Sequence, residues 1–192
     1  MINKQLKVDE YFDDPVNTTM INERCIELAL GIRYMEKDSL TEVGAVMPHY
    51  GYAEHKVIDL FSEDCPSGVI ENIDAETCDF TGQDVLCLST IEHIGKEDYD
   101  NPDIDPEKAI RILDKITSES NSFMVTWGTR YHNELDTYVK DNLDKYDWFG
   151  YIKREEKLWE YTGTDMAVWE QEFDKPYRYA NGNIFLLPKV AA

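Results

Sequence analysis

Residues 84–95 are the most informative segment for predicting the fold, and they read Asp84-Val85-Leu86-Cys87-Leu88-Ser89-Thr90-Ile91-Glu92-His93-Ile94-Gly95. Its four successive apolar residues, Val85 to Leu88, are typical of a strand covered on both faces, as strands of parallel sheets are. Polar residues follow at once. Because open α/β sheets bind ligands at the carboxyl ends of their strands, we expect the segment after Leu88 to contribute to a site.

The sequence on either side of this strand predicts an alternation of strands and helices. Apolar residues at helical spacing predict helices over 19–37, 106–118 and 135–146. Apolar runs bounded by turn residues predict further strands over 39–46, 56–61, 69–73, 122–127, 151–154 and 183–188. This order predicts an α/β fold: a three-layer sandwich around one mostly parallel sheet, with an antiparallel C-terminal strand pair.

The length of 192 residues suits a single domain. Polar residues and the turn signal Asp13-Asp14-Pro15 predict an N-terminal arm over 1–18, followed by one domain over 19–192. No run approaches the roughly 20 apolar residues that span a bilayer. The cysteines form no C-x-x-C pair, which favours reduced thiols, a cytoplasmic location and no zinc site; they are Cys25, Cys65, Cys78 and Cys87.

Acidic residues outnumber basic ones by 39 to 19, which gives a formal net charge of -20. Such a surface repels phosphate backbones and anionic lipid, so nucleic acid and membranes are disfavoured as partners. Adaptation to a saline environment would produce the same composition, and both explanations stay open. A small molecule that is neutral or cationic fits this charge best.

Asp59 closes the strand predicted over 56–61, and its place suits recognition of a ribose. A carboxylate offers two oxygens to a vicinal diol, so an acidic residue at a strand end can accept hydrogen bonds from both ribose hydroxyls. A strand-end carboxylate that caps a turn explains the same residue equally well.

The ordered series Glu42-x-Gly44, Asp59, Asp74-Ala75 and the 84–95 stretch resembles the Rossmann-like (class I) S-adenosylmethionine-dependent methyltransferases. The resemblance covers about residues 19–190. Its strongest part is Leu88 to Gly95, which is similar to the S-x-x-E-H-x-G segment of many small-molecule methyltransferases. The resemblance implies that fold and S-adenosylmethionine as the cofactor.

The first loop departs from the family pattern E/D-x-G-x-G-x-G, because Val46 and Pro48 stand at the second and third glycine positions. Glycine lets a backbone approach a ligand closely and adopt positive φ. The cofactor is therefore held differently, with Gly44 and Gly51 as the permissive points, or the fold is retained and the cofactor site is degraded. A nicotinamide cofactor is disfavoured, since G-x-G-x-x-G is absent.

The resemblance also implies a role for each matching position. Glu42 would orient the first loop and the ammonium end of the cofactor, and Gly44 would allow its close approach. Asp59 would bind the ribose hydroxyls. The remaining cofactor-binding positions would be Asp74, accepting from the adenine amine, Ala75 beside the adenine, and Ser89 and Thr90 beneath the methionine part.

Glu92 and His93 are the candidates for a catalytic base. Adjacent residues after a strand point in different directions, so we expect only one of them to face the pocket. An imidazole near its ordinary pKa takes a proton at neutral pH. In the alternative, His93 packs against the following helix and Glu92 caps that helix.

The predicted function is transfer of a methyl group from S-adenosylmethionine to an oxygen or nitrogen of a small molecule. Alternatives are a methyltransferase-like binding or scaffold protein without the cofactor, and an enzyme that uses the sulfonium differently. No N-P-P-Y segment follows the strand, which argues against a DNA methyltransferase. The acidic run over 97–105 lacks the EF-hand pattern and is interpreted as a solvated loop, not a metal site. C-terminal aromatic residues predict a lid, a homodimer face or an outer core layer: Trp159, Tyr161, Trp169, Tyr177 and Tyr179.

Overall fold

The computed structural model describes residues 11, 12, 14, 16–61, 70–98 and 104–190. Across these residues one eight-stranded sheet has the strand order β3-β2-β1-β4-β5-β8-β6-β7. The strands are β1 Leu40–Val43, β2 Lys56–Asp59, β3 Ile70–Asn72, β4 Asp84–Leu88, β5 Ser122–Gly128, β6 Tyr146–Glu155, β7 Leu158–Gly163 and β8 Gly182–Pro188. The α-helices are α1 Arg24–Tyr34, α2 Glu107–Glu119 and α3 Asn133–Asp141.

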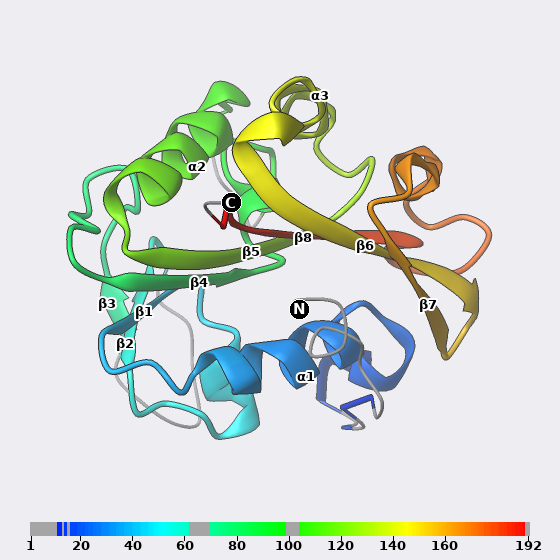
Figure 1. The fold of residues 1–192 in the computed structure, drawn as a ribbon. Helices are drawn as coiled ribbons and strands as arrows, with labels where there is room; N and C mark the ends of the chain where they lie inside the picture. The colour runs from blue at the N-terminus through cyan, green and yellow to red at the C-terminus, as the bar shows by residue number, and fades with distance from the viewer. Residues whose placement is uncertain (1–10, 13, 15, 62–69, 99–103, 191–192) are drawn as a thin grey trace.

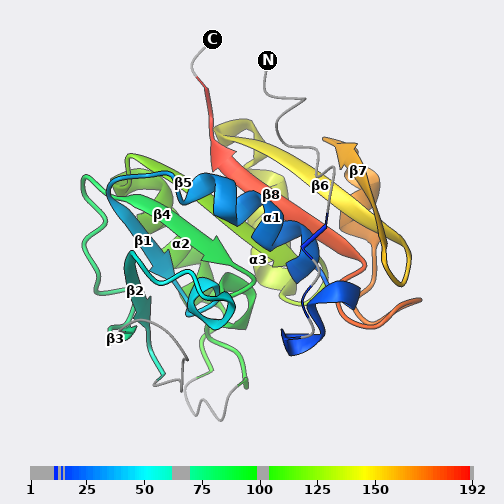
Figure 2. The ribbon, with the colours of Figure 1, turned by 90° about the horizontal axis from the view of Figure 1, so that it is seen from below.

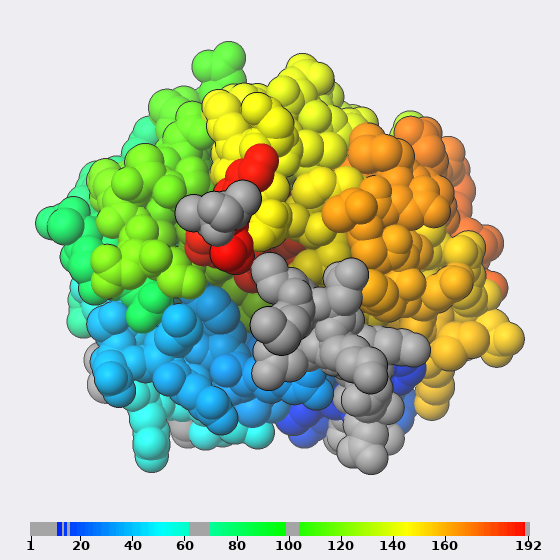
Figure 3. Space-filling model, viewed as in Figure 1, coloured from blue at the N-terminus to red at the C-terminus, as the bar shows by residue number. Residues whose placement is uncertain are grey.

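Strands β1 to β5 run parallel to one another, and β8 pairs antiparallel with both β5 and β6. The predicted Rossmann-like α/β class is therefore confirmed, as is the antiparallel pair formed by the C-terminal strands. Figure 3 shows the red end of the chain emerging between the green and yellow segments, as this order requires. Strand β7 was not predicted; it pairs with β6 and extends the sheet at its edge.

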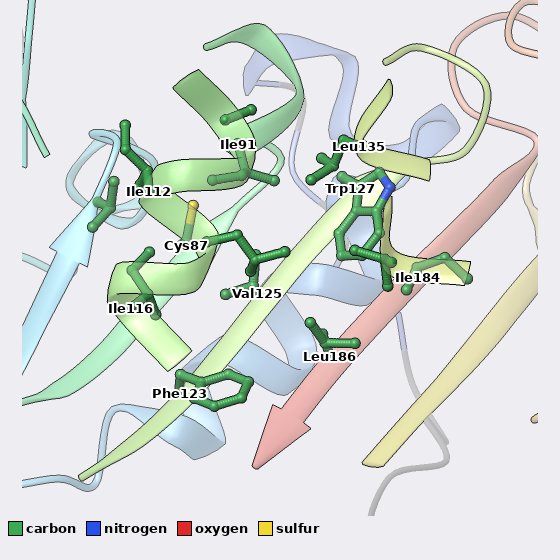
Figure 4. Close-up of a cluster of buried hydrophobic side chains, with 14 of the residues drawn as sticks. Cys87, Ile91, Ile112, Ile116, Phe123, Val125, Trp127, Leu135, Ile184 and Leu186 are labelled. Atoms are coloured by element: carbon green, nitrogen blue, oxygen red, sulfur yellow. The ribbon is translucent and has the colours of Figure 1, made fainter. Parts of the chain in front are cut away.

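Helices cover both faces of the sheet, with α2 and α3 on one side and α1 on the other (Figures 1 and 2). Alternate residues of β4 enter different cores, because successive side chains of a strand point to opposite faces. Cys87 packs with Val125 of β5 and Ile112 of α2 in the first core (Figure 4), whereas Leu86 and Leu88 belong to the core beneath α1. The apolar run that predicted a doubly covered strand is explained by these two layers.

Several element boundaries differ from the predictions. Residues Val16–Ile21 form a separate 3-10 helix, so α1 begins at Arg24 instead of residue 19. Strand β1 ends at Val43, because Gly44 turns the chain with φ of 86°. Tyr146 begins β6, although it was expected to end a helix; α3 stops at Asp141 and a 3-10 turn follows. Strand β3 begins at Ile70, and Val69 lies outside the described residues.

Described residues of the predicted arm contact the rest of the chain. The Tyr11 hydroxyl donates to the carbonyl of Trp159 at 2.7 Å, and the amide of Phe12 donates to the carbonyl of Cys25 at 3.0 Å. Residues 1–10, 13 and 15 lie outside the described part, as does Cys65. The thiols of Cys25, Cys78 and Cys87 are free and buried.

Candidate functional site

A cavity of about 220 Å³ opens at the carboxyl ends of β1, β2 and β4. These strands meet where the chain reverses its direction of progress across the sheet, between β1 and β4, and open α/β sheets bind ligands at such a point. Figure 2 shows β1, β4 and β5 pointing to the same end of the molecule. Most of the predicted site residues line this cavity: Gly44, Asp59, Asp74, Ala75, Ser89, Thr90 and His93. Glu42, Gly51 and Glu92 are not among the lining residues.

Glu42 organises the loop after β1 from inside the protein. Its fully buried Oε1 accepts hydrogen bonds from the amides of Val46 at 2.9 Å and Met47 at 2.8 Å. Its Oε2 lies 2.6 Å from Nε2 of His55. Burial raises the pKa of Glu42, and the hydrogen bond from His55 opposes that rise. Both oxygens are thus used to fix the loop that carries Gly44.

The two predicted glycines have different surroundings. Gly44 has φ of 86°, and a Cβ added to it would lie 2.1 Å from Oγ1 of Thr90, so any larger residue would be strained and would collide. Gly51 has φ of 88° but ends the 3-10 helix Met47–Tyr50 on the surface, with nothing within 4 Å of an added Cβ. Val46 stands at the start of this helix with φ of -94°, so its backbone needs no glycine. A 3-10 helix therefore stands where the family pattern has a glycine-rich loop.

Asp59 lines the cavity and also holds the turn that follows β2. Its Oδ2 accepts from the amide of Ala45 at 3.2 Å and its Oδ1 from the amide of Phe61 at 2.8 Å. Leu60 and Phe61 line the same wall and are 47% and 39% exposed. The sequence analysis did not select these two residues; two apolar residues directly after a strand-end aspartate were the available signal.

Asp74 lines the cavity near the start of α2. Its Oδ1 accepts from the amide of Glu76 at 3.0 Å, and its Oδ2 lies 2.6 Å from Nζ of Lys108. Ile73 and Ala75 line the cavity on either side of Asp74. This end of the cavity therefore combines apolar side chains with an ion pair.

The structure separates Glu92 from His93. His93 lines the cavity, and its Nδ1 lies 2.9 Å from Oδ2 of Asp98. Glu92 is 4% exposed and turned inward, where its Oε1 accepts from the amide of Gly128 at 3.4 Å. Among the described residues its Oε2 has no hydrogen-bond partner. Burial, and then the nearby carboxylate of Glu27, raise the pKa of Glu92 well above its ordinary value.

Arg24 and Glu27, in the first turn of α1, were not predicted from the sequence as site residues. Arg24 lines the cavity, and its Nη1 donates to the carbonyl of Leu88 at 3.1 Å and lies 3.4 Å from Oε2 of Glu27. Glu27 is fully buried, and its Oε1 accepts from three side chains: Ser89 at 2.6 Å, Thr126 at 2.6 Å and Asn183 at 3.0 Å. Opposite charges three residues apart at a helix start were the available signal.

The remaining histidine and aromatic side chains have mixed positions. His49 and Tyr50 line the cavity, whereas His132 is buried at the start of α3, where its Nδ1 accepts from the amide of Leu135 at 3.2 Å. Trp159 and Trp169 are buried in the two cores. Among the described residues, no three His, Cys, Asp or Glu side chains form a group that could hold a metal ion. None of the helices in this part of the chain has the length and apolar character needed to cross a membrane.

Comparison with known proteins gives matches to solved structures only. Neither the protein-family models nor the curated proteins match the chain. Magnesium protoporphyrin IX methyltransferase from Synechocystis PCC 6803, in crystals with bound SAM, is 9% identical; the match covers 93% of this chain and 87% of that one, with a TM-score of 0.44. The same enzyme with bound SAH is 8% identical, over 85% and 81% of the two chains, with a TM-score of 0.43. A protein from Pyrococcus horikoshii OT3 is 15% identical, over 83% and 87%, with a TM-score of 0.37.

Proposed function

We propose that this protein is an S-adenosylmethionine-dependent methyltransferase that methylates an oxygen or nitrogen of a small molecule. The observation that carries the proposal is one cavity, at the point where the strand order reverses, that collects Gly44, Asp59, Ala75 and Thr90 from the ends of different strands. The net charge of -20 supports an acceptor that is not a polyanion.

The wall beyond β2 suits the adenosine half of the cofactor. Asp59 lines this wall, and its carboxylate has the acceptor chemistry that ribose hydroxyls require, besides accepting from the amides of Ala45 and Phe61. Leu60, Phe61 and Ala75 offer apolar surface to a purine. Asp74 would accept from the exocyclic amine through the lone pairs that its bond with Lys108 leaves available.

The wall around Gly44 suits the methionine half. Gly44 keeps the backbone close to Thr90, and Ser89 forms the floor beneath. Arg24 contacts Leu88 and Glu27 through Nη1 alone, and a guanidinium has five N–H donors, so donors remain for a ligand carboxylate. Glu42 acts indirectly, because it fixes the loop that carries Gly44.

When bound, the cofactor supplies a methyl group on a positively charged sulfur. The protein's own task is to align an acceptor with that methyl group and to keep water away, which lowers the barrier by positioning. The apolar wall and the buried floor of the cavity serve both purposes, because they position the acceptor and exclude water. A base is needed only where the acceptor must lose a proton.

Calorimetric titration with S-adenosylmethionine and S-adenosylhomocysteine tests the proposal. We expect both to bind, and we expect Asp59→Ala to weaken binding about 30-fold, which is about 2 kcal/mol for charge-assisted hydrogen bonds. Asp141→Ala is the control, because Asp141 is an exposed aspartate at the end of α3. Absence of binding at millimolar concentration would support the alternative of a binding or scaffold protein without the cofactor. Product analysis would identify a different sulfonium chemistry.

A further inference from the structure

We propose that Lys108 determines which base the cofactor site accepts, by donating a hydrogen bond to ring nitrogen N1 of adenine while Asp74 accepts one from the neighbouring amine. This inference rests on the proposed function and deepens it, because it gives a role to a residue that the sequence analysis did not select. The ligand class is an adenine nucleoside whose Watson–Crick edge is intact.

The first observation is the position of Lys108 in α2. Lys108 and Ile112 are four residues apart in this helix, so they lie on the same helix face, and both line the cavity. The side chain of Lys108 is 20% exposed, whereas Ile112 is buried in the core. Lys108 therefore reaches the cavity with an apolar neighbour beside it.

The second observation is the contact between Lys108 and Asp74. Nζ of Lys108 donates to Oδ2 of Asp74 at 2.6 Å, and Oδ1 of Asp74 accepts from the amide of Glu76 at 3.0 Å. An ammonium group has three N–H donors, and among the described residues Asp74 is the hydrogen-bond partner of this one. A donor and an acceptor thus lie next to each other where both can also bind a ligand.

The third observation is that apolar side chains surround this pair. Ile73 and Ala75 flank Asp74 in the chain and line the cavity, as Ile112 does. A purine has apolar faces and a polar edge, so it fits an apolar slot that ends in a donor and an acceptor. The amino-acid end of the cofactor carries two charges and would place them against these apolar groups, so the pair suits the base.

The order of donor and acceptor matches adenine. Its amine donates, and N1, which is attached to the same ring carbon, accepts; Asp74 and Lys108 offer the complementary groups. The other acceptor near the amine, N7, is one bond farther away, and the short distance between Oδ2 and Nζ favours N1. Hypoxanthine has a carbonyl in place of the amine and a proton on N1. Asp74 would then face an acceptor and Lys108 a donor, so the site should reject this base.

Calorimetric titration compares S-adenosylhomocysteine with its 1-deaza analogue, in which a C–H group replaces N1 and the amine remains. We expect the wild type to bind the analogue about tenfold more weakly, since a hydrogen bond from a charged donor is lost. Lys108→Met should bind both ligands equally, at about the affinity of the wild type for the analogue. Equal binding of the two ligands by the wild type, or unequal binding by Lys108→Met, would overturn the proposal.

Two further ligands test which atoms are recognised. The 7-deaza analogue should bind the wild type as S-adenosylhomocysteine does, and a loss with this analogue in place of the 1-deaza analogue would contradict the assignment to N1. S-Inosylhomocysteine should bind the wild type at least about tenfold more weakly than S-adenosylhomocysteine. That ratio should shrink in Lys108→Met, and an unchanged ratio would mean that Lys108 does not select the base.

Lys115→Met is the matched control. Lys115 also lies in α2 and pairs with a carboxylate, that of Glu119 at 2.7 Å, but it is not among the residues that line the cavity. Partly exposed ion pairs contribute little to stability, so thermal unfolding of both variants should resemble that of the wild type. Lys115→Met should bind all the ligands as the wild type does. The same losses in both variants would show that the effect does not come from contact with the base.

The wild type distinguishes failure of this inference from failure of the proposed function. If it binds neither S-adenosylmethionine nor S-adenosylhomocysteine, the proposed function fails. If it binds both but does not distinguish S-adenosylhomocysteine from the 1-deaza analogue, the proposed function stands and only the role of Lys108 is overturned.

Discussion

Asp59 and Asp98 line the cavity, whereas Glu27 and Glu92 lie directly behind its wall, and the two pairs have different surroundings. Asp59 and Asp98 accept a few hydrogen bonds and face the space where a ligand would lie. Glu27 is enclosed by three donors and Arg24, and Glu92 is buried with one backbone donor. A carboxylate behind the wall therefore acts mainly on stability, and one on the wall acts mainly on binding and chemistry.

The largest expected effect belongs to Glu27. In Glu27→Leu the hydroxyls of Ser89 and Thr126 and the amide of Asn183 lose their acceptor, and Arg24 loses its counter-charge. We expect the free energy of unfolding to fall by about 3–5 kcal/mol, measured by urea denaturation. Glu27→Gln keeps an acceptor and should cost less, and the exposed control Glu36→Ala should change little. A small loss in Glu27→Leu would remove the distinction between the two pairs.

A backbone position on the wall should affect stability and binding together. Gly44→Ala forces a Cβ against Thr90 at positive φ, and we expect a loss of about 3 kcal/mol in unfolding free energy together with weaker binding of S-adenosylmethionine. Gly51→Ala has similar φ but open space around it, so we expect about 1 kcal/mol and unchanged binding. Thermal unfolding measures the stability of both variants, and calorimetry measures their binding of S-adenosylmethionine. Equal behaviour of the two would show that the contact with Thr90 is unimportant.

An effect that is smaller per pH unit, and that depends on pH, is expected at Glu92. Its pKa is raised in the folded state, so the folded protein binds more protons than the unfolded chain above pH about 4.3, the ordinary glutamate value. Wild-type stability should therefore fall relative to Glu92→Gln as pH rises through that value, by up to about 1.4 kcal/mol per pH unit until the folded-state pKa is reached. Denaturation curves between pH 4 and pH 8 measure the difference. A flat difference at Glu92 would mean that its burial has no cost.

The sequence predicted the sheet well, because the information needed is local. Four apolar residues in β4, and the helical spacing of apolar residues in α2, indicate which faces of these elements are buried. The boundaries of helices and strands were less predictable. Nothing in the local sequence shows that Asn17 and Thr18 adopt positive φ, so that α1 begins later in the chain than predicted. Strand β7 was missed because its burial is one-sided and its pairing with β6 sets its position.

The candidate site was predicted where a residue directly follows a strand. Gly44, Asp59 and Thr90 lie on the cavity wall because parallel strands carry their carboxyl ends to one edge of the sheet. Arg24 and Asp98 were not predicted as site residues, since α1 and the segment after His93 reach the cavity only through folding.

The α/β class, the strand ends that meet at the cavity and the excess of negative charge can all be predicted from the amino-acid sequence. These follow from hydrophobic periodicity, from the geometry of parallel strands and from composition. Which carboxylates face the cavity, and which support it from behind, depends on the folded structure. Glu92 and His93 are neighbours in the chain, yet one turns to the amide of Gly128 and the other to Asp98. The direction of a side chain depends on the partners that burial brings to it, and these come from distant parts of the sequence.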